Sequence, residues 1–205
     1  MNTSRRAAGF GLLAYGIATP VAYMSMGSPG GESIDRDIAK YISSGHQAGT
    51  IALTYLGGIA ALGLLLFANW MRHELRSGGG LLWGLAVAAT TAAVTGWLLV
   101  GGMAVAFAEG GESLASIPHP VINLLGLMSN VVAVVTSGFF LGAAALVLAA
   151  RASLPRWLRI ASYVAGLCGL LGASNWLLVL LWLWAIAFGV WTIRSNASST
   201  QGATA

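Results

Sequence analysis

The chain has few charged residues. Only 8% of its 205 residues are Asp, Glu, Lys or Arg, whereas 57% are hydrophobic. A soluble domain has about 25% charged residues, so this composition excludes an ordinary soluble domain and predicts a membrane protein. The net charge of +4 arises from ten basic residues in small clusters between apolar runs. Such clusters are typical of membrane topology, and we expect the lipid bilayer, not a nucleic acid, as the partner of this surface.

Cysteine and catalytic motifs are scarce as well. Cys168 is the only cysteine, which excludes an intramolecular disulfide and a redox-active thiol pair. The chain has no Gly-x-Ser-x-Gly elbow, no phosphate-binding Gly-x-x-x-x-Gly-Lys-Ser/Thr loop and no His-Glu-x-x-His helix. The cores of the apolar runs contain no Asp, Glu, Lys or Arg, which argues against a proton relay, a voltage sensor or an ion-coupled carrier. These absences favour a protein that is not an enzyme and leave a passive pore or a lipid-binding groove open.

The apolar runs themselves are long. A helix needs about 20 apolar residues to cross about 30 Å of hydrocarbon. We predict an all-α fold, a polytopic membrane helix bundle of about six transmembrane helices that forms a single integral membrane domain over residues 1–205. The first span is interpreted as an uncleaved helix, because no small-residue site for signal cleavage follows it. The expected spans cover residues 7–26, 46–70, 81–108, 121–150, 156–173 and 175–193, with a tail at 194–205.

The last two spans share a short stretch of chain. Residues 156–193 suffice for two helices if the chain reverses near Gly172 to Asn175, and one bent helix is the alternative. Cytoplasmic links are rich in Lys and Arg, and this rule favours an even number of spans with both termini in the cytoplasm. Only Arg36 and Lys40 then lie outside, and only Glu74 among the acidic residues lies inside. The basic residues expected inside are Arg5, Arg6, Arg72, Arg76, Arg151, Arg156, Arg159 and Arg194.

The first outer link has helical periodicity. Ile34, Ile38, Tyr41 and Ile42 recur at helical spacing with charged residues between them. This pattern predicts a short extracytoplasmic amphipathic helix over residues 33–43. We expect it to pack at the outer membrane interface, and a lid or docking surface is the alternative.

Glycine and tryptophan suggest helix contacts. Glycines recur at spacings that let helix backbones approach, either within one bundle or between two copies. Trp182 and Trp184 lie in the middle of the last span, where such residues usually pack against neighbours or lipid; the interaction hypothesis takes them as exposed. The spaced glycines are Gly80 with Gly84, Gly138 with Gly142, and Gly166, Gly169 and Gly172.

Neutral polar residues form stripes on three of the expected spans. The spacing places each stripe on one helix face, and we expect these faces to turn inward. They are interpreted as hydrogen-bonding contacts between helices, with a ligand-binding site as the alternative. The stripes are His46, Thr50, Thr54 and Gly57; Thr91, Thr95 and Gly102; and His119, Asn123, Gly126, Asn130 and Ser137.

Two histidines allow a sharper hypothesis. His46 and His119 are expected at the outer ends of spans two and four, at similar depth. With Glu109 or Glu112, and with Asp35 or Asp37 as further candidates, they could bind a metal ion, and alternatively the two imidazoles could ligate a haem iron. The spacing of these residues matches no known motif, so the main expectation is a protein without a cofactor.

Several segments resemble a group of bacterial six-span membrane proteins of uncharacterised activity. The matching segments are the amphipathic stretch Ile34 to Ile42, the span end and basic link Phe67 to Arg76, and the helix entry Leu154-Pro155-Arg156-Trp157-Leu158. The short final hairpin departs from the pattern of that group. The resemblance implies a location in the bacterial cytoplasmic membrane and supplies no catalytic residues.

Two functional hypotheses follow. The first is a non-enzymatic accessory or interaction subunit of a larger membrane complex, or a homo-oligomer, because of the mid-span tryptophans and the spaced glycines. The alternative is a protein that binds a small ligand, metal or haem at the extracytoplasmic ends of spans two and four.

Overall fold

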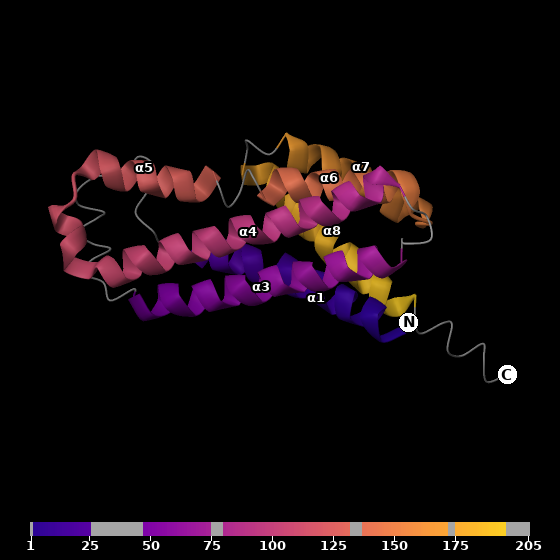
Figure 1. Ribbon diagram of the computed structural model, residues 1–205, viewed down its shortest axis with the longest axis horizontal. Coiled ribbons are helices and arrows are strands. Elements are labelled where there is room, and N and C mark those ends of the chain that lie inside the picture. The colour runs from indigo at the N-terminus through magenta and orange to yellow at the C-terminus, as the bar shows by residue number, and fades with distance from the viewer. Residues whose placement is uncertain (1, 26–46, 75–79, 132–136, 172–174, 196–205) are drawn as a thin grey trace.

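The computed structural model describes residues 2–25, 47–74, 80–131, 137–171 and 175–195, and every regular element in these ranges is a helix. The prediction of an all-α helix bundle is confirmed. The expected amphipathic helix at residues 33–43 and the tail beyond residue 195 lie outside these ranges. The helices, labelled in Figure 1, are α1 (Asn2–Ser25), α3 (Gln47–Glu74), α4 (Leu81–Gly110), the 3-10 helix η2 (Gly111–Ser116), α5 (His119–Asn130), α6 (Ser137–Arg151), α7 (Arg156–Leu170) and α8 (Asn175–Arg194).

Six of the helices form a closed ring. Going around the ring, α1 packs against α3, α3 against α4, α4 against α6, α6 against α7, α7 against α8, and α8 returns to α1. Successive helices run in opposite directions (Figure 1), so the start of α1 and the end of α8 lie at the same end of the bundle. There Arg5 Nη2 donates a hydrogen bond of 2.8 Å to Ser195 Oγ, and its guanidinium lies 5.0 Å from the ring centre of Trp191.

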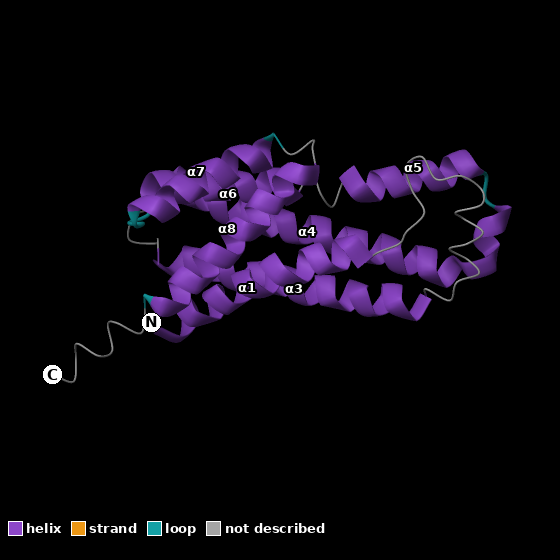
Figure 2. Ribbon diagram, turned by 180° about the vertical axis from the view of Figure 1, so that it is seen from behind, coloured by secondary structure: helices purple, strands orange, loops and turns teal. Residues whose placement is uncertain are grey.

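The region expected to form span four contains two helices. Where one element was expected over residues 121–150, α5 and α6 lie one after the other along the bundle, and residues 132–136 between them are outside the described part (Figure 2). By contrast, residues 156–193 form two helices, α7 and α8, instead of one bent helix. Pro155 precedes α7, because proline fits a helix start without losing a hydrogen bond.

Among the described residues, three helical stretches are long and apolar enough to cross a membrane. The qualifying stretches are Thr54–His73 in α3, Leu81–Gly110 in α4 and Leu177–Arg194 in α8. Two shorter apolar stretches, His119–Met128 and Ser137–Ala150, lie in α5 and α6. These lengths support a helical membrane protein.

Aromatic side chains fill the contact between α3 and α8. The Phe67 ring centre lies 5.6 Å from that of Trp70 and 5.7 Å from that of Phe188, and Phe188 lies 5.4 Å from Trp184. Trp182 and Trp184 are 5% and 2% exposed. The expectation that these two tryptophans are exposed is therefore wrong, because both are buried against other helices of the chain.

Glycines hold three helix pairs close together. Gly11 of α1 faces Gly63 of α3, and Gly9 of α1 faces Gly189 of α8. In the α6–α7 pair, a Cβ on Gly142 would lie 2.9 Å from Gly169 Cα. The sequence left open whether such glycines form contacts within one bundle or between two copies of the chain. Gly142 and Gly169 form a contact within one chain. A Cβ on Gly84 would meet nothing within 4 Å, so Gly84 joins none of these contacts.

Candidate functional site

The polar residues expected on span two lie in the first turns of α3. Thr50 is buried, and Thr54 is half-buried with its Oγ1 donating to the Thr50 carbonyl oxygen at 2.9 Å. The Thr54 methyl group packs at Gly101 of α4, where an added Cβ would lie 3.0 Å from it. Thr54 therefore acts as a packing contact between α3 and α4. His46, the outermost member of this stripe, lies outside the described residues.

The matching residues of span four lie on α5. Pro118 precedes the helix, and His119 is its first residue. His119 and Asn123 are one helical turn apart, and both are half-buried. Further along the chain, Ser137 at the start of α6 is buried and donates to the Ala93 carbonyl oxygen of α4 at 3.1 Å. This bond joins two helices, as the packing interpretation of the stripe expects.

The expected metal ligands are only partly described. Glu109 is exposed near the end of α4, and the side chains of Glu112 and Asn130 lie outside the description, as does His46. Within the described ranges, no group of three or more His, Cys, Asp or Glu is placed to hold a metal ion. The metal and haem hypotheses remain predictions.

The third expected stripe faces away from the bundle. Thr91, Thr95 and Gly102 of α4 are all exposed, so the expectation that they turn inward is wrong. Thr90 is the threonine that turns inward, and it is fully buried. Neighbouring residues differ by about 100° around a helix, and α4 is apolar on every side. The hydrophobic pattern of α4 therefore did not show whether the threonine stripe turns inward or outward.

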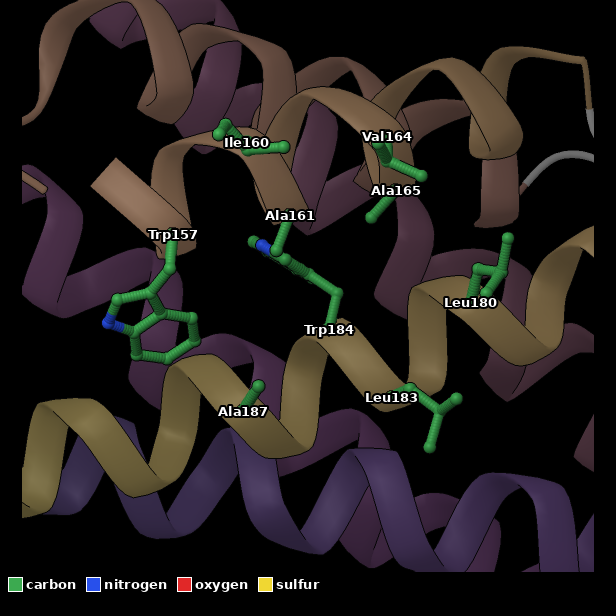
Figure 3. Close-up of a pocket in the computed structure, with 9 residues that line it drawn as sticks. All are labelled: Trp157, Ile160, Ala161, Val164, Ala165, Leu180, Leu183, Trp184 and Ala187. Atoms are coloured by element: carbon green, nitrogen blue, oxygen red, sulfur yellow. The ribbon is translucent and has the colours of Figure 1, made fainter. Parts of the chain in front are cut away.

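A groove of about 370 Å³ lies between α7 and α8 (Figure 3). Trp157 stands at one end, and Leu180 and Leu183 at the other. The Trp184 indole at its base donates from Nε1 to Ser162 Oγ at 2.8 Å, and Ser162 Oγ donates to the Leu158 carbonyl oxygen at 2.8 Å. The lining residues are Trp157, Ile160, Ala161, Val164, Ala165, Leu180, Leu183, Trp184 and Ala187. This surface offers apolar contact and no catalytic group.

A second groove, of about 430 Å³, lies between α4 and α6. Alanines of α4, among them Ala89 and Ala92, face Phe139, Phe140 and Ala143 of α6. Sequence reasoning singled out neither groove, because each is built from residues of two helices whose pairing is not visible in the periodicity of either.

Comparisons with protein families, with curated protein sequences and with solved structures give no match to this chain. The functional assignment therefore depends on the chain's own residues. The described surface offers three features beyond ordinary packing: the outward face of α4, the groove between α7 and α8, and the groove between α4 and α6.

Proposed function

We propose that this chain is a non-enzymatic membrane protein that works as an accessory subunit, and that the outward face of α4 binds a transmembrane helix of its partner. We name this face the α4 outer face and define it as Gly84, Ala88, Thr91, Thr95 and Gly102. These residues recur at spacings of four, three, four and seven and are all exposed. The observation that carries the proposal is that these small residues form an exposed stripe, flanked by the exposed side chains of Leu98 and Leu99, and that no described residue of another helix lies within 4 Å of a Cβ added at Gly84 or Gly102.

The residues that α3 and α7 expose are larger than those of the α4 outer face. α3 presents Tyr55, Ile59 and Leu62 at its surface, and α7 presents Ile160 and Leu167. Large branched side chains suit contact with lipid tails, whereas small residues let two helix backbones approach closely. The glycines that meet within the chain, such as Gly142 and Gly169, illustrate the second case. By this comparison the α4 outer face resembles a helix-packing surface.

The hydroxyl groups on this face add a second argument. Thr91 Oγ1 donates to the Val87 carbonyl oxygen at 2.9 Å, and Thr95 Oγ1 donates to the Thr91 carbonyl oxygen at 3.3 Å. These internal bonds let both threonines face hydrocarbon without an unpaired donor. Each hydroxyl oxygen can still accept a hydrogen bond from a partner helix, and such bonds between helices contribute about 0.6 to 2 kcal/mol in a membrane.

The same proposal includes six membrane crossings in the cytoplasmic membrane of a bacterium, with both termini in the cytoplasm. The crossings are α1, α3, α4, the α5–α6 pair, α7 and α8. The alternating directions and the Arg5–Ser195 contact support a shared end for the two termini. Arg72, Arg156 and Arg194 are exposed at that end, whereas Glu109 lies near the opposite end of α4. Basic residues favour the cytoplasmic side, so the end that carries the arginines is assigned to the cytoplasm.

Site-specific photo-crosslinking in native membranes tests the partner surface. A benzophenone amino acid replaces Thr95 on α4, and in a matched control it replaces Leu62, which is 59% exposed on α3. We expect a protein adduct of defined mass from position 95 and only lipid adducts from position 62. Two differently tagged copies of the chain, expressed together, distinguish a second copy from another protein.

The result that overturns the proposal is equally specific. If positions 95 and 91 give only lipid adducts in membranes from the native host, the α4 outer face has no partner helix. Adducts of similar yield from positions 62 and 95 would also contradict it, because contact would then lack any preference for the small-residue face.

A further inference from the structure

We propose that the groove between α7 and α8 binds an acyl chain of an anionic phospholipid, and that Arg156 and Arg194 hold its phosphate at the cytoplasmic surface. This inference uses the membrane orientation of the proposed function and involves a different surface from the α4 outer face. The proposed ligand is a lipid with a negatively charged headgroup, because the groove fits its acyl chain and the arginines beside the groove fit its phosphate.

The lining of the groove suits a hydrocarbon chain. Ile160, Val164, Leu180 and Leu183 form its walls, and Ala161 and Ala187 leave room between them (Figure 3). At the base of the groove, the Trp184 indole N–H donates a 2.8 Å hydrogen bond to the Ser162 hydroxyl oxygen. The side chains that line the groove are apolar except for the indole N–H groups of Trp157 and Trp184, so burial of apolar surface is the main source of binding energy.

The end of the groove near Trp157 carries positive charge. Arg156 precedes Trp157 as the first residue of α7, and it lies one turn before Ile160. Arg194 ends α8 and lies two turns beyond Ala187 on the same helix face. Both arginines are exposed, and no Asp or Glu occurs in the sequence after Glu112. Two exposed cations at the ends of helices that carry no carboxylate complement a phosphate.

The dimensions match one leaflet of a bilayer. With a rise of about 1.5 Å per residue, Leu183 lies about 16 Å along α8 from Arg194. Half of the hydrocarbon core is about 15 Å thick. A lipid with its phosphate at the arginines thus places its acyl chain along the groove. Trp157, 54% exposed, stands between the two regions, where the amphipathic indole is favoured.

The test measures lipid binding to the purified full-length chain in mild detergent by native mass spectrometry. Dioleoylphosphatidylglycerol is titrated beside dioleoylphosphatidylcholine, which has the same acyl chains and no net charge. We expect tighter binding of the anionic lipid, and about fivefold weaker binding of that lipid for each arginine removed, in Arg156→Gln and in Arg194→Gln. Arg156→Lys should keep most of the selectivity. Arg6→Gln, which removes an exposed charge from α1, is the matched control and should leave binding unchanged.

A second pair of variants tests the groove itself. Ala161→Leu fills the α7–α8 groove and should weaken both lipids, whereas Ala143→Leu fills the α4–α6 groove and should leave the preference for the anionic lipid intact. Thermal unfolding of each variant verifies that it is folded.

Three results would overturn the lipid site. The first is equal binding of the two lipids, and the second is unchanged binding in both arginine variants. The third is displacement of the anionic lipid by an equal concentration of glycerol 3-phosphate, which would identify a soluble anion as the ligand.

Crosslinking at Thr95 tests the partner surface independently of the lipid site. A protein adduct there with no lipid selectivity removes the lipid site alone, and lipid selectivity without an adduct removes the partner surface alone.

Discussion

Gly11 of α1 and Gly63 of α3 face each other so closely that a Cβ on either would lie 3.0 Å from the Cα of the other and would overlap its carbonyl group. The contact is reciprocal, so neither helix can accept even a methyl group there without moving. We expect Gly11→Ala and Gly63→Ala each to destabilise the bundle by at least about 2 kcal/mol, because overpacking at a backbone contact forces the helices apart. Equilibrium unfolding in mixed detergent and dodecyl sulfate measures this cost.

Gly58 on α3 is the matched control. A Cβ on Gly58 would meet nothing within 4 Å. Alanine also restricts the unfolded chain more than glycine does, so Gly58→Ala should raise stability by about 0.5 to 1 kcal/mol. Similar losses at positions 58 and 63 would show that α3 does not pack on α1 through this glycine.

The hydrogen bond between Trp184 and Ser162 joins α8 to α7. Ser162→Ala leaves the buried indole N–H without its acceptor and should cost about 1 kcal/mol. Trp184→Phe removes the donor but also leaves a cavity. The double variant should therefore cost less than the sum of the two single variants, and the difference is the coupling energy. Additive costs would mean that the two side chains do not interact.

The orientation of α4 can be tested with two adjacent threonines. Thr90→Leu inserts a larger side chain at a fully buried position and should destabilise the bundle by about 1 to 3 kcal/mol. Thr91→Leu changes an exposed position and should alter stability by no more than about 0.5 kcal/mol. Unfolding curves of the two purified variants provide the comparison. The reverse order of effects would restore the inward orientation suggested by the stripe Thr91, Thr95 and Gly102.

The contact of Arg5 with Ser195 and Trp191 closes the ring between the first and last helices. Removal of its charge in Arg5→Gln should lower the local opening free energy by about 1 kcal/mol, which accelerates amide hydrogen exchange in the first turns of α1 about fivefold. Arg6→Gln is the control, because Arg6 is exposed. Equal exchange rates in the two variants would argue that Arg5 does not hold α1 to α8.

Helix positions could be predicted where the sequence has a clear stop or start. Pro155 marks the beginning of α7, and Gly80 lies directly before α4. Residues 121–150 offered a weaker signal: Ser129-Asn130 and Thr136-Ser137 interrupt the apolar run, but Asn130 and Ser137 also fit one face of a continuous helix, so periodicity did not locate the boundary. The pairing of α1 with α3 through Gly11 and Gly63 was equally hidden, since contact between distant glycines depends on the rotation of both helices.

The candidate site was less predictable than the fold. Stripe spacing places His119 and Asn123 one turn apart on α5, and the structure has both half-buried there. Thr91 and Thr95 share a face as expected, but spacing alone does not say whether that face meets protein or lipid. In a water-soluble helix polar residues mark the outside, whereas hydrocarbon removes this signal. The Trp184–Ser162 pair lacked any sequence signal, because the two residues belong to different helices.

The central claim is a six-span bundle whose arginine-bearing end lies in the cytoplasm, and labelling of single cysteines tests it most directly. In a Cys168→Ser background, Ser113→Cys introduces an exposed thiol in η2 and Ser153→Cys introduces one between α6 and α7. Intact cells are treated with a membrane-impermeant maleimide. The account predicts labelling of Ser113→Cys in intact cells and of Ser153→Cys only after permeabilisation. Labelling of Ser153→Cys in intact cells, with Ser113→Cys protected, would contradict it.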